Sequence, residues 1–325
     1  MPRISFFLLP LLLIIFSNAD SQTNKNSVSL GKVVASFALD EKGIPYLIEG
    51  TIGKQRNPMT ICNKALYYHD QLVKGDSTKK VFFLNCADWL KEDLIQENDF
   101  AVLKYNYDWQ IYNMTAPWRS GLANGVSLQV FIKAHALTHD EQYLITAKQI
   151  LNSFYVEVSK GGVAYKSENE GWWFEEFSDE GGYVSRVLNG HMFALVGLHD
   201  YFTYTHDSSA LYAFDKGLLG LKNNLAKYDN PGGPSFYDLR GTKANIKYHQ
   251  IHVDLLSRLF EISHDPIYKS YSDKWGAYKH PSLITRLITP PVKRIDIAIW
   301  FVNFAIALLL VFVITFLIIR KSNKP

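Results

Sequence analysis

The residue types best suited to acid–base chemistry gather in one stretch, between Tyr228 and His252. Its first half contains Asn-Pro-Gly-Gly-Pro at 230–234, which breaks both helix and strand. Its second half carries Tyr-Asp-Leu-Arg at 237–240 and Tyr-His-x-x-His at 248–252. Phenols, carboxylates and imidazoles accept and donate protons, and such groups usually sit on loops held by a rigid scaffold. We therefore predict that this stretch forms part of a catalytic site.

Helical segments must position this loop, because apolar residues recur at helical spacing on both sides of it. Three pairs of such segments follow one another: 121–137 with 141–155, 187–204 with 208–227, and 247–262 with 266–278. The same dipeptide joins the two members of each pair: His139-Asp140, His206-Asp207 and His264-Asp265. Aspartate is a common N-cap. We interpret the dipeptides as structural turns rather than metal ligands.

Helical hairpins repeated at a long period are typical of a solenoid or of its closed form, the α/α toroid. We favour the toroid because the aromatic loops at 105–118, 156–186 and 228–246 would then reach one rim and form a bowl. The predicted fold is mainly α-helical, an incomplete barrel of helical hairpins over residues 58–280. A small extended or β segment over residues 20–57, with alternating apolar and polar positions, is expected to precede it.

The composition excludes some classes of function. A formal net charge of +3, with no run of Lys and Arg, argues against a nucleic-acid partner. Aromatic residues make up 14% of the chain, which suits either carbohydrate binding or a large helical core. The two cysteines, Cys62 and Cys86, leave a disulfide open.

Both ends of the chain carry membrane-related patterns. Residues 1–19 resemble a secretory signal: a positive start, an apolar run and small residues at the cleavage position. Residues 281–296 are a proline-containing linker, 297–319 are long and apolar enough to cross a bilayer, and 320–325 form a basic tail. We expect a single C-terminal span, with the central domain outside the cytoplasm at the cell surface or in a secretory lumen.

Five motifs occur in a fixed order along the chain. They are Pro-Trp-Arg-Ser-Gly-Leu-Ala-Asn-Gly at 117–125, Trp-Trp-Phe-Glu-Glu-Phe at 172–177, Val-Leu-Asn-Gly at 187–190, Tyr-Asp-Leu-Arg at 237–240 and Tyr-His-x-x-His at 248–252. Together they resemble the C-terminal domain of D-glucuronyl C5-epimerases, which convert glucuronate to iduronate in heparan-type chains. The resemblance spans residues 105–278 and implies an α/α barrel.

The resemblance implies roles for individual residues. Glu176, Tyr237, Tyr248 and Arg240 are expected to be catalytic. The residues expected to bind substrate are Trp118, Arg119, Trp173, Asn189, His249 and His252. Packing is an equal reading for Trp173, and backbone bonding or a shared metal is an alternative for the two histidines. Two positions depart from the family pattern: Phe177 and Arg119 stand where the family has tyrosines. The loss of the phenol at 177 puts two-base epimerisation in question.

The chemistry implied is removal of the C5 proton of a uronate residue in a polysaccharide, and its return from the opposite face. Arg240 would neutralise the substrate carboxylate through its planar fork, and Glu176 and a tyrosine would serve as the two bases. The route requires no cofactor and no metal. A polysaccharide lyase that eliminates the C4 substituent is an alternative, as is a glycan-binding protein without turnover. Assembly as a homodimer is left open.

Overall fold

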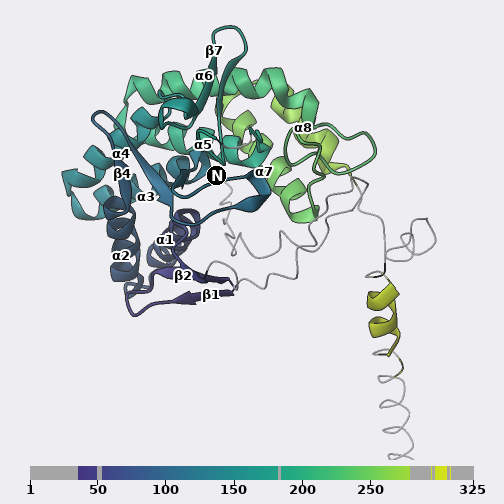
Figure 1. Ribbon diagram of the computed structural model, residues 1–325, viewed down its shortest axis with the longest axis horizontal. Coiled ribbons are helices and arrows are strands. Elements are labelled where there is room, and N and C mark those ends of the chain that lie inside the picture. The colour runs from purple at the N-terminus through teal and green to yellow at the C-terminus, as the bar shows by residue number, and fades with distance from the viewer. Residues whose placement is uncertain are drawn as a thin grey trace, which may run out of the picture. The chain divides into compact units, whose positions relative to one another are not determined.

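The structure is a computed structural model that describes residues 36–49, 53–181 and 184–278, together with 294, 297–305 and 308 (Figure 1). The chain divides into two units, Met1–Gly276 and Ala277–Pro325. The first unit holds all the named helices and strands. Its helices form four consecutive hairpins, and its strands form three small sheets.

The four hairpins account for the helical periodicity of the sequence. They are α1 (Pro58–Val73) with α2 (Lys79–Glu92), α3 (Gly121–Thr138) with α4 (Glu141–Ser153), α5 (Leu188–Thr205) with α6 (Ser208–Asn224), and α7 (Ile246–Ser263) with α8 (Pro266–Gly276). The three predicted hairpins are confirmed. The helical pattern from residue 58 onward forms the additional hairpin that precedes them.

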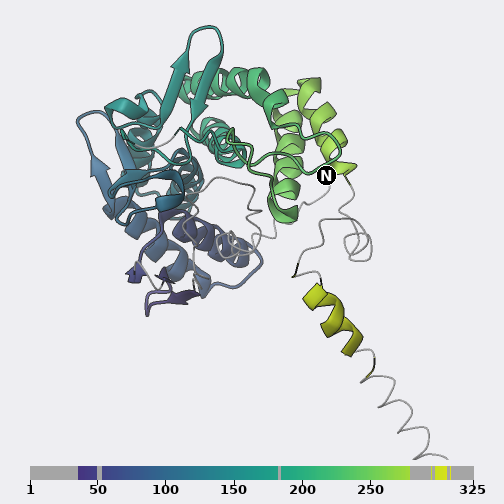
Figure 2. The ribbon, with the colours of Figure 1, turned by 45° about the vertical axis from the view of Figure 1, so that its right-hand side comes forward.

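The hairpins stack so that α1, α3, α5 and α7 form an inner row, and each outer helix packs on its own hairpin partner (Figures 1 and 2). Helices α3 and α5 are buried on almost every side and carry few charged residues, as helices in the middle of a core must. The fold is therefore mainly helical, with the two layers expected of an α/α barrel.

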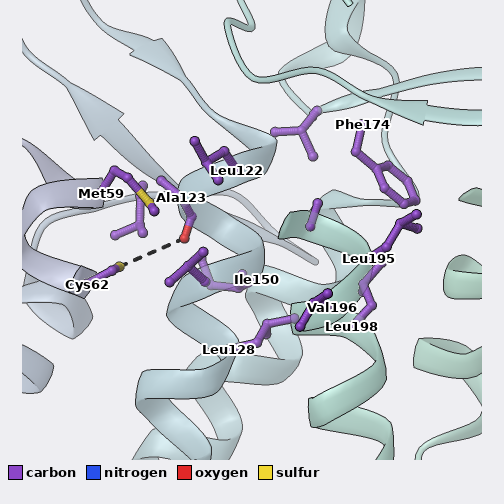
Figure 3. Packing of buried hydrophobic residues seen from close by; sticks show 14 of the residues in the cluster. Met59, Cys62, Leu122, Ala123, Leu128, Ile150, Phe174, Leu195, Val196 and Leu198 are labelled. Atoms are coloured by element: carbon purple, nitrogen blue, oxygen red, sulfur yellow. Dashed lines mark hydrogen bonds between the residues drawn. The ribbon is translucent and has the colours of Figure 1, made fainter. Parts of the chain in front are cut away.

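Small residues bring α3 and α5 into close contact. A Cβ added to Gly125 would lie 2.5 Å from the Ala194 Cα, and one added to Gly197 would lie 1.9 Å from the Gly125 carbonyl oxygen. Neither glycine can be replaced without separating the helices. Side chains such as Leu122, Leu128, Leu195 and Leu198 fill the space around this contact (Figure 3).

The strands lie before and between the hairpins. An antiparallel sheet with the order β1-β2-β3 (Ser36–Leu39, Pro45–Glu49, Gly53–Gln55) confirms the predicted N-terminal β segment where the structure describes it. The sequence patterns did not predict β4 (Leu94–Gln96), β5 (Ala101–Tyr105), β6 (Trp118–Arg119), β7 (Ala164–Ser167) or β8 (Gly171–Phe174). β6 leads directly into α3, and β8 delivers the Glu-Glu pair at 175–176 to the start of α5.

The three His-Asp dipeptides are structural turns. Each histidine ends an inner helix in the left-handed region, with φ of 57°, 57° and 56° at His139, His206 and His264. Each aspartate caps the next helix by accepting a backbone N–H, from Gln142, Ser209 and Ile267 respectively. In the described ranges, no group of three or more His, Cys, Asp or Glu side chains could hold a metal ion.

Cys62 and Cys86 are both buried free thiols, and the Cys62 Sγ faces the Ala123 carbonyl oxygen at 4.0 Å (Figure 3). A membrane span is not found: no helix of the described chain is both long and apolar enough to cross a bilayer. The predicted signal at 1–19 and the tail at 320–325 lie outside the described residues. Only 297–305 and 308 of the predicted span at 297–319 are described, and they are helical.

Candidate active site

The Glu-Glu pair is held against the first turn of α3. The Gly121 N–H donates to the Glu175 carbonyl oxygen at 2.7 Å, and a Cβ on Gly121 would lie 2.8 Å from the same atom. Ser120 caps α3 by accepting the Ala123 N–H. The Ser-Gly-Leu-Ala motif is therefore a helix start that fits closely against the backbone of the Glu-Glu pair.

Glu175 is a structural carboxylate. It is completely buried, and its oxygens accept hydrogen bonds from the Ser185 hydroxyl at 2.7 Å and from the Arg186 N–H at 3.0 and 3.1 Å. Burial raises its pKa to about 7, although these hydrogen bonds act in the opposite direction. Glu175 thus fastens the segment that leads into α5.

Glu176 has the opposite environment. It is 8% exposed, and its Oε2 has no hydrogen-bond partner among the described residues. Its Oε1 lies 3.5 Å from the Tyr237 hydroxyl, at the long limit of a hydrogen bond. A Cβ on Gly190 would lie 2.4 Å from the Glu176 Oε2, so the glycine of Val-Leu-Asn-Gly is what leaves room for this carboxyl group.

Two tyrosines complete the cluster around Glu176. The rings of Tyr237 and Tyr248 meet edge to face with centroids 4.9 Å apart. Tyr237 comes from the loop before α7, whereas Tyr248 stands in the first turn of α7. The structure therefore brings together Glu176, Tyr237 and Tyr248, three of the four residues predicted to be catalytic.

Burial shifts the protonation of all three groups. It raises the pKa of Glu176 to about 8, helped by the nearby Glu175 carboxylate, while the Tyr237 hydrogen bond partly offsets the rise. Burial, followed by the charge of Glu176, also raises the pKa of Tyr237 and of Tyr248 above that of an ordinary tyrosine. At neutral pH the phenols are protonated, and a pKa of about 8 suits Glu176 to act as a general acid or base.

Arg240, the fourth predicted catalytic residue, contacts Ile111 and Tyr112. Its side chain is exposed, its Nη1 donates to the Ile111 carbonyl oxygen at 2.8 Å, and its Cζ lies 5.5 Å from the Tyr112 ring centroid. Its contact with protein backbone differs from the free fork expected for binding a carboxylate. The carboxylate-binding role of Arg240 stays a prediction.

The two tryptophans predicted to bind substrate, Trp118 and Trp173, are part of the core. Trp118 is 3% exposed, stacks on Tyr105 at a centroid distance of 3.8 Å and donates its Nε1–H to the Tyr107 carbonyl oxygen. Trp173 is 2% exposed and stacks on His191 at 4.1 Å. Buried rings packed in this way present no face to a sugar, so their contacts favour packing over substrate binding.

Arg119 is also engaged by protein groups. It is buried, forms an ion pair with Glu180 at 2.8 Å and donates to the carbonyl oxygens of Val158 and Gly162. These contacts tie β6 to the loop between α4 and β7. They explain why an arginine suits this position, and they leave its guanidinium committed to the protein.

The two histidines of Tyr-His-x-x-His form a buried cluster with Ser235. The His249 Nδ1 accepts the Ser235 N–H at 2.9 Å, so its proton is on Nε2, which donates to the Trp275 carbonyl oxygen at 3.0 Å. The Ser235 Oγ lies 2.8 Å from the His252 Nδ1. These bonds fasten the loop that carries Tyr237 to the helix that carries Tyr248, which is a structural role; contact of the two histidines with substrate stays a prediction.

Asn189 lies in the first turn of α5, next to Gly190. It is 1% exposed, and its Oδ1 has no hydrogen-bond partner in the described part of the chain. Two buried oxygens that no described residue pairs, Asn189 Oδ1 and Glu176 Oε2, therefore belong to residues that flank and touch Gly190. Buried polar atoms are seldom left unpaired, and exceptions concentrate at functional sites.

The sequence analysis missed two residues beside the site, Tyr112 and Asp238. The Tyr112 hydroxyl donates to the Asp238 Oδ2 at 2.8 Å, and its ring stacks on Phe177 with centroids 4.3 Å apart. Tyr112 belongs to an aromatic loop predicted to reach the rim, and Asp238 to the Tyr-Asp-Leu-Arg motif. Only their meeting in space, 126 positions apart in the chain, identifies them.

Comparison with known proteins identifies the relatives of this arrangement. The family model described as D-glucuronyl C5-epimerase C-terminus matches residues 96–277. A D-glucuronyl C5-epimerase of Caenorhabditis elegans is 29% identical over 221 residues, which are 61% of this chain and 35% of that protein. An uncharacterised protein of Methanocaldococcus jannaschii is 30% identical over 263 residues, 74% of this chain and 84% of its own length. The chain thus spans about a third of the worm enzyme.

Solved structures support the helical fold. A D-mannose isomerase matches with a TM-score of 0.50 at 13% identity, covering 74% of this chain and 65% of its own. A GH76 α-mannanase of Bacteroides thetaiotaomicron matches with a TM-score of 0.50 at 12% identity, covering 74% and 63%. At such identities the likeness concerns the fold alone.

The five motifs, the position of Glu176 between β8 and α5, and the family match over more than half of the sequence agree with one another. The resemblance inferred from the motifs is therefore confirmed. The chain belongs to the D-glucuronyl C5-epimerase C-terminus family, and its enzyme class is that of the carbohydrate epimerases.

Proposed function

We propose that this protein is a uronate C5-epimerase that converts D-glucuronate to L-iduronate residues within a polysaccharide. The observation that carries the proposal is the environment of Glu176: a buried carboxyl group near two phenols, with one oxygen that no described residue pairs. Epimerisation at C5 requires a base and an acid whose protons move near neutral pH. Glu176, with a pKa raised to about 8, and the protonated phenols supply both.

The steps follow from the chemistry of the uronate. Glu176 in its ionised form removes the C5 proton, and the electron pair moves into the adjacent carboxylate. A phenol, from Tyr237 or Tyr248, then donates a proton to C5 from the opposite face. After the product leaves, Glu176 releases its proton to water and the phenolate takes one up from water, so that no atom is gained or lost in the cycle.

The contact between Glu176 and Tyr237 adds a condition to this scheme. With Glu176 and Tyr237 as the two bases, the sugar ring lies between them and needs a gap wide enough to hold it. At 3.5 Å they are in contact, and no ring fits between them. Substrate binding must therefore separate Glu176 from Tyr237, or Tyr248 must serve as the group on the opposite face.

The remaining contacts of the substrate are assigned by charge and hydrogen-bonding type. Asn189 Oδ1 is a buried acceptor beside Glu176, suited to a ring hydroxyl. Arg240 is the cation in contact with Ile111 and Tyr112, and we assign it to the uronate carboxylate, which requires its bond to Ile111 to be exchanged for the substrate. Arg240→Lys should then be a poor enzyme, because an ammonium group cannot form the planar fork.

One experiment separates this function from its alternatives. The protein is incubated with a glucuronate-containing polysaccharide in heavy water, and deuterium at C5, iduronate content and absorbance of unsaturated uronate are measured. An epimerase incorporates deuterium and forms iduronate without shortening the chain. A lyase produces the unsaturated chromophore. A glycan-binding protein, the alternative favoured by Phe177 in place of the family tyrosine, binds the polymer and exchanges nothing.

The location is a further part of the proposal. The apolar patterns at 1–19 and 297–319 support a protein anchored at its C-terminal end, with residues 20–294 outside the cytoplasm. Protease added to sealed vesicles of known orientation would test this arrangement. Cleavage of the central domain only from the cytoplasmic side would contradict it.

A further inference from the structure

Two turns from distant parts of the chain meet beside the site. The Tyr112 hydroxyl donates to the Asp238 Oδ2 at 2.8 Å, and the Arg240 Nη1 donates to the Ile111 carbonyl oxygen at 2.8 Å. The Arg240 guanidinium also lies over the Tyr112 ring at 5.5 Å. We call these four residues, Ile111, Tyr112, Asp238 and Arg240, the clasp.

Asp238 determines the shape of the turn that follows Tyr237. The Asp238 Oδ1 accepts the N–H groups of Arg240 and Thr242, and its Oδ2 also accepts the Thr242 hydroxyl. The Tyr237 N–H donates to the Thr242 carbonyl oxygen at 2.6 Å, and the Tyr237 carbonyl oxygen accepts the Leu188 N–H at 2.9 Å. Tyr237 is therefore held between this turn and the start of α5.

Tyr112 contacts the residue that follows Glu176 and the residue that follows Tyr237. Its ring stacks on Phe177, the residue after Glu176, at 4.3 Å and an interplanar angle of 15°. Its hydroxyl binds Asp238, the residue after Tyr237. Tyr112 is buried, at 6% exposure, so both contacts are shielded from solvent.

A direct role for Tyr112 in proton transfer is opposed by its partner. If the phenol gave its proton to a substrate, a phenolate would be left 2.8 Å from the Asp238 carboxylate inside the protein. Two like charges at that distance, both buried, destabilise each other strongly. The Tyr112 hydroxyl is therefore suited to remain a hydrogen-bond donor throughout the reaction.

We infer that Tyr112 is a positioning residue: its bond to Asp238 and its stack on Phe177 hold in place the two backbone segments that carry Tyr237 and Glu176. The inference rests on the proposed epimerase function. It also gives Phe177 a structural role, because the Phe177 ring packs face to face on the Tyr112 ring.

The variant Tyr112→Phe tests the inference, since it removes the hydroxyl and keeps the stacked ring. In the full chain, kcat for C5 hydrogen exchange should fall about tenfold, with KM changed less than about twofold. Amide hydrogen exchange of residues 238–242, followed by mass spectrometry, should become about tenfold faster. The second measurement requires no catalytic activity.

The control is Tyr143→Phe. Tyr143 is another buried tyrosine whose hydroxyl donates to a carboxylate, the Asp88 Oδ1 at 2.7 Å, but this bond joins α4 to α2 away from the site. The control should leave kcat and the exchange of 238–242 unchanged, even where it lowers the melting temperature as much as Tyr112→Phe does.

Each result decides something. If the wild-type protein exchanges C5 hydrogen and Tyr112→Phe matches its kcat, the positioning role is wrong and the proposed function stands. If Tyr143→Phe lowers kcat equally, the effect of Tyr112 is a general loss of stability, and the inference is again wrong. If the wild-type protein shows no C5 exchange, the proposed function fails. In that case, unchanged amide exchange of residues 238–242 in Tyr112→Phe shows that Tyr112 does not hold the turn either. Faster amide exchange shows that Tyr112 holds the turn but has no role in catalysis.

Discussion

The two ends of the inner helices are built in opposite ways. At the C-terminal ends of α3, α5 and α7 the chain repeats one turn, and its polar groups pair with one another. Thr138, Thr205 and Ser263 accept the N–H of the aspartate two residues later, and each aspartate caps the next helix. Ion pairs from Lys148 to Asp207 and from Lys222 to Asp265 join successive hairpins.

At the N-terminal ends of α5 and α7 the pairing is incomplete. Glu176 Oε2, Asn189 Oδ1 and His252 Nε2 are buried atoms without hydrogen-bond partners in the part of the chain that the structure describes. An unsatisfied buried polar group costs about 1–3 kcal/mol. Among the described residues, His199 Nδ1 and Arg258 Nε, in the C-terminal halves of α5 and α7, also lack partners, so incomplete pairing is not confined to the loop end. The difference is that the His-Asp turns use their polar groups in structural bonds, whereas the loop end leaves two buried oxygens of the described chain unpaired around Gly190.

The largest effect is expected for Glu176→Gln. The amide keeps the shape of the side chain but cannot take a proton from C5, so exchange should fall by about 10³-fold or more. Measuring C5 exchange and the free energy of unfolding on the same preparation checks this. A large loss of stability together with the loss of activity would place Glu176 with the structural groups and remove the contrast between the two ends.

The same variant should change the pH dependence of stability. The pKa of Glu176 is raised to about 8 in the folded protein, so between about pH 4.5 and 8 the folded state holds a proton that the unfolded state releases. The protonated Glu176 side chain therefore contributes fully to the free energy of unfolding below pH 4.5, and this contribution is lost as the pH rises towards 8. Glu176→Gln removes this loss, and its stability relative to wild type should increase by about 2–4 kcal/mol from pH 5 to pH 8. Parallel pH profiles in urea unfolding would contradict the shifted pKa.

Glu175→Ala should behave as the structural counterpart of Glu176. Removing the acceptor of the Ser185 and Arg186 bonds leaves buried donors unpaired and should destabilise the fold by about 3 kcal/mol. Thermal or denaturant unfolding measures this cost. Glu175→Gln, which retains an acceptor oxygen, should recover part of the stability. If Glu175→Ala were neutral, the division of labour within the Glu-Glu pair would be wrong.

The smallest effects are expected at the turn end. Asp140→Ala should cost about 1 kcal/mol, the usual value of an N-cap. Asp207→Ala should cost about 1.5 kcal/mol, because Asp207 also binds Lys148 at 2.7 Å and the Ser209 hydroxyl. Lys148→Met alone should lower the free energy of unfolding slightly. In the Asp207→Ala background it should have no further effect, because the ion pair is already lost. Under stabilising conditions, C5 exchange should be unchanged in all three variants. If the wild-type protein held a stoichiometric metal ion that these variants lost, the interpretation of the His-Asp turns as structural would be wrong.

The elements governed by local patterns were predictable. Helical periodicity places α3 to α8 within a few residues of their observed bounds, and Asp140, Asp207 and Asp265 cap helices as their residue type suggests. The left-handed backbone conformation of His139, His206 and His264 was not predicted, because a positive φ depends on how the preceding helix ends.

Only the site residues that belong to the family motifs could be predicted from the sequence. Glu176, Tyr237 and Tyr248 come together as the family resemblance implied. Whether Trp118 and Trp173 face a sugar or the core depends on tertiary packing, which no local pattern records. The pairing of Tyr112 with Asp238 joins positions too far apart in sequence to be read from either segment alone.

The most direct test of the central claim is C5 hydrogen exchange in heavy water by wild-type protein, measured from pH 5 to pH 9 on a glucuronate-containing polysaccharide. With Glu176 as the base, the exchange rate should rise with its ionised fraction and level off above about pH 8. Deuterium should enter at C5 of both glucuronate and newly formed iduronate. Binding of the polymer without deuterium at C5 at any pH would contradict the account, and the protein would then be a glycan-binding member of its family.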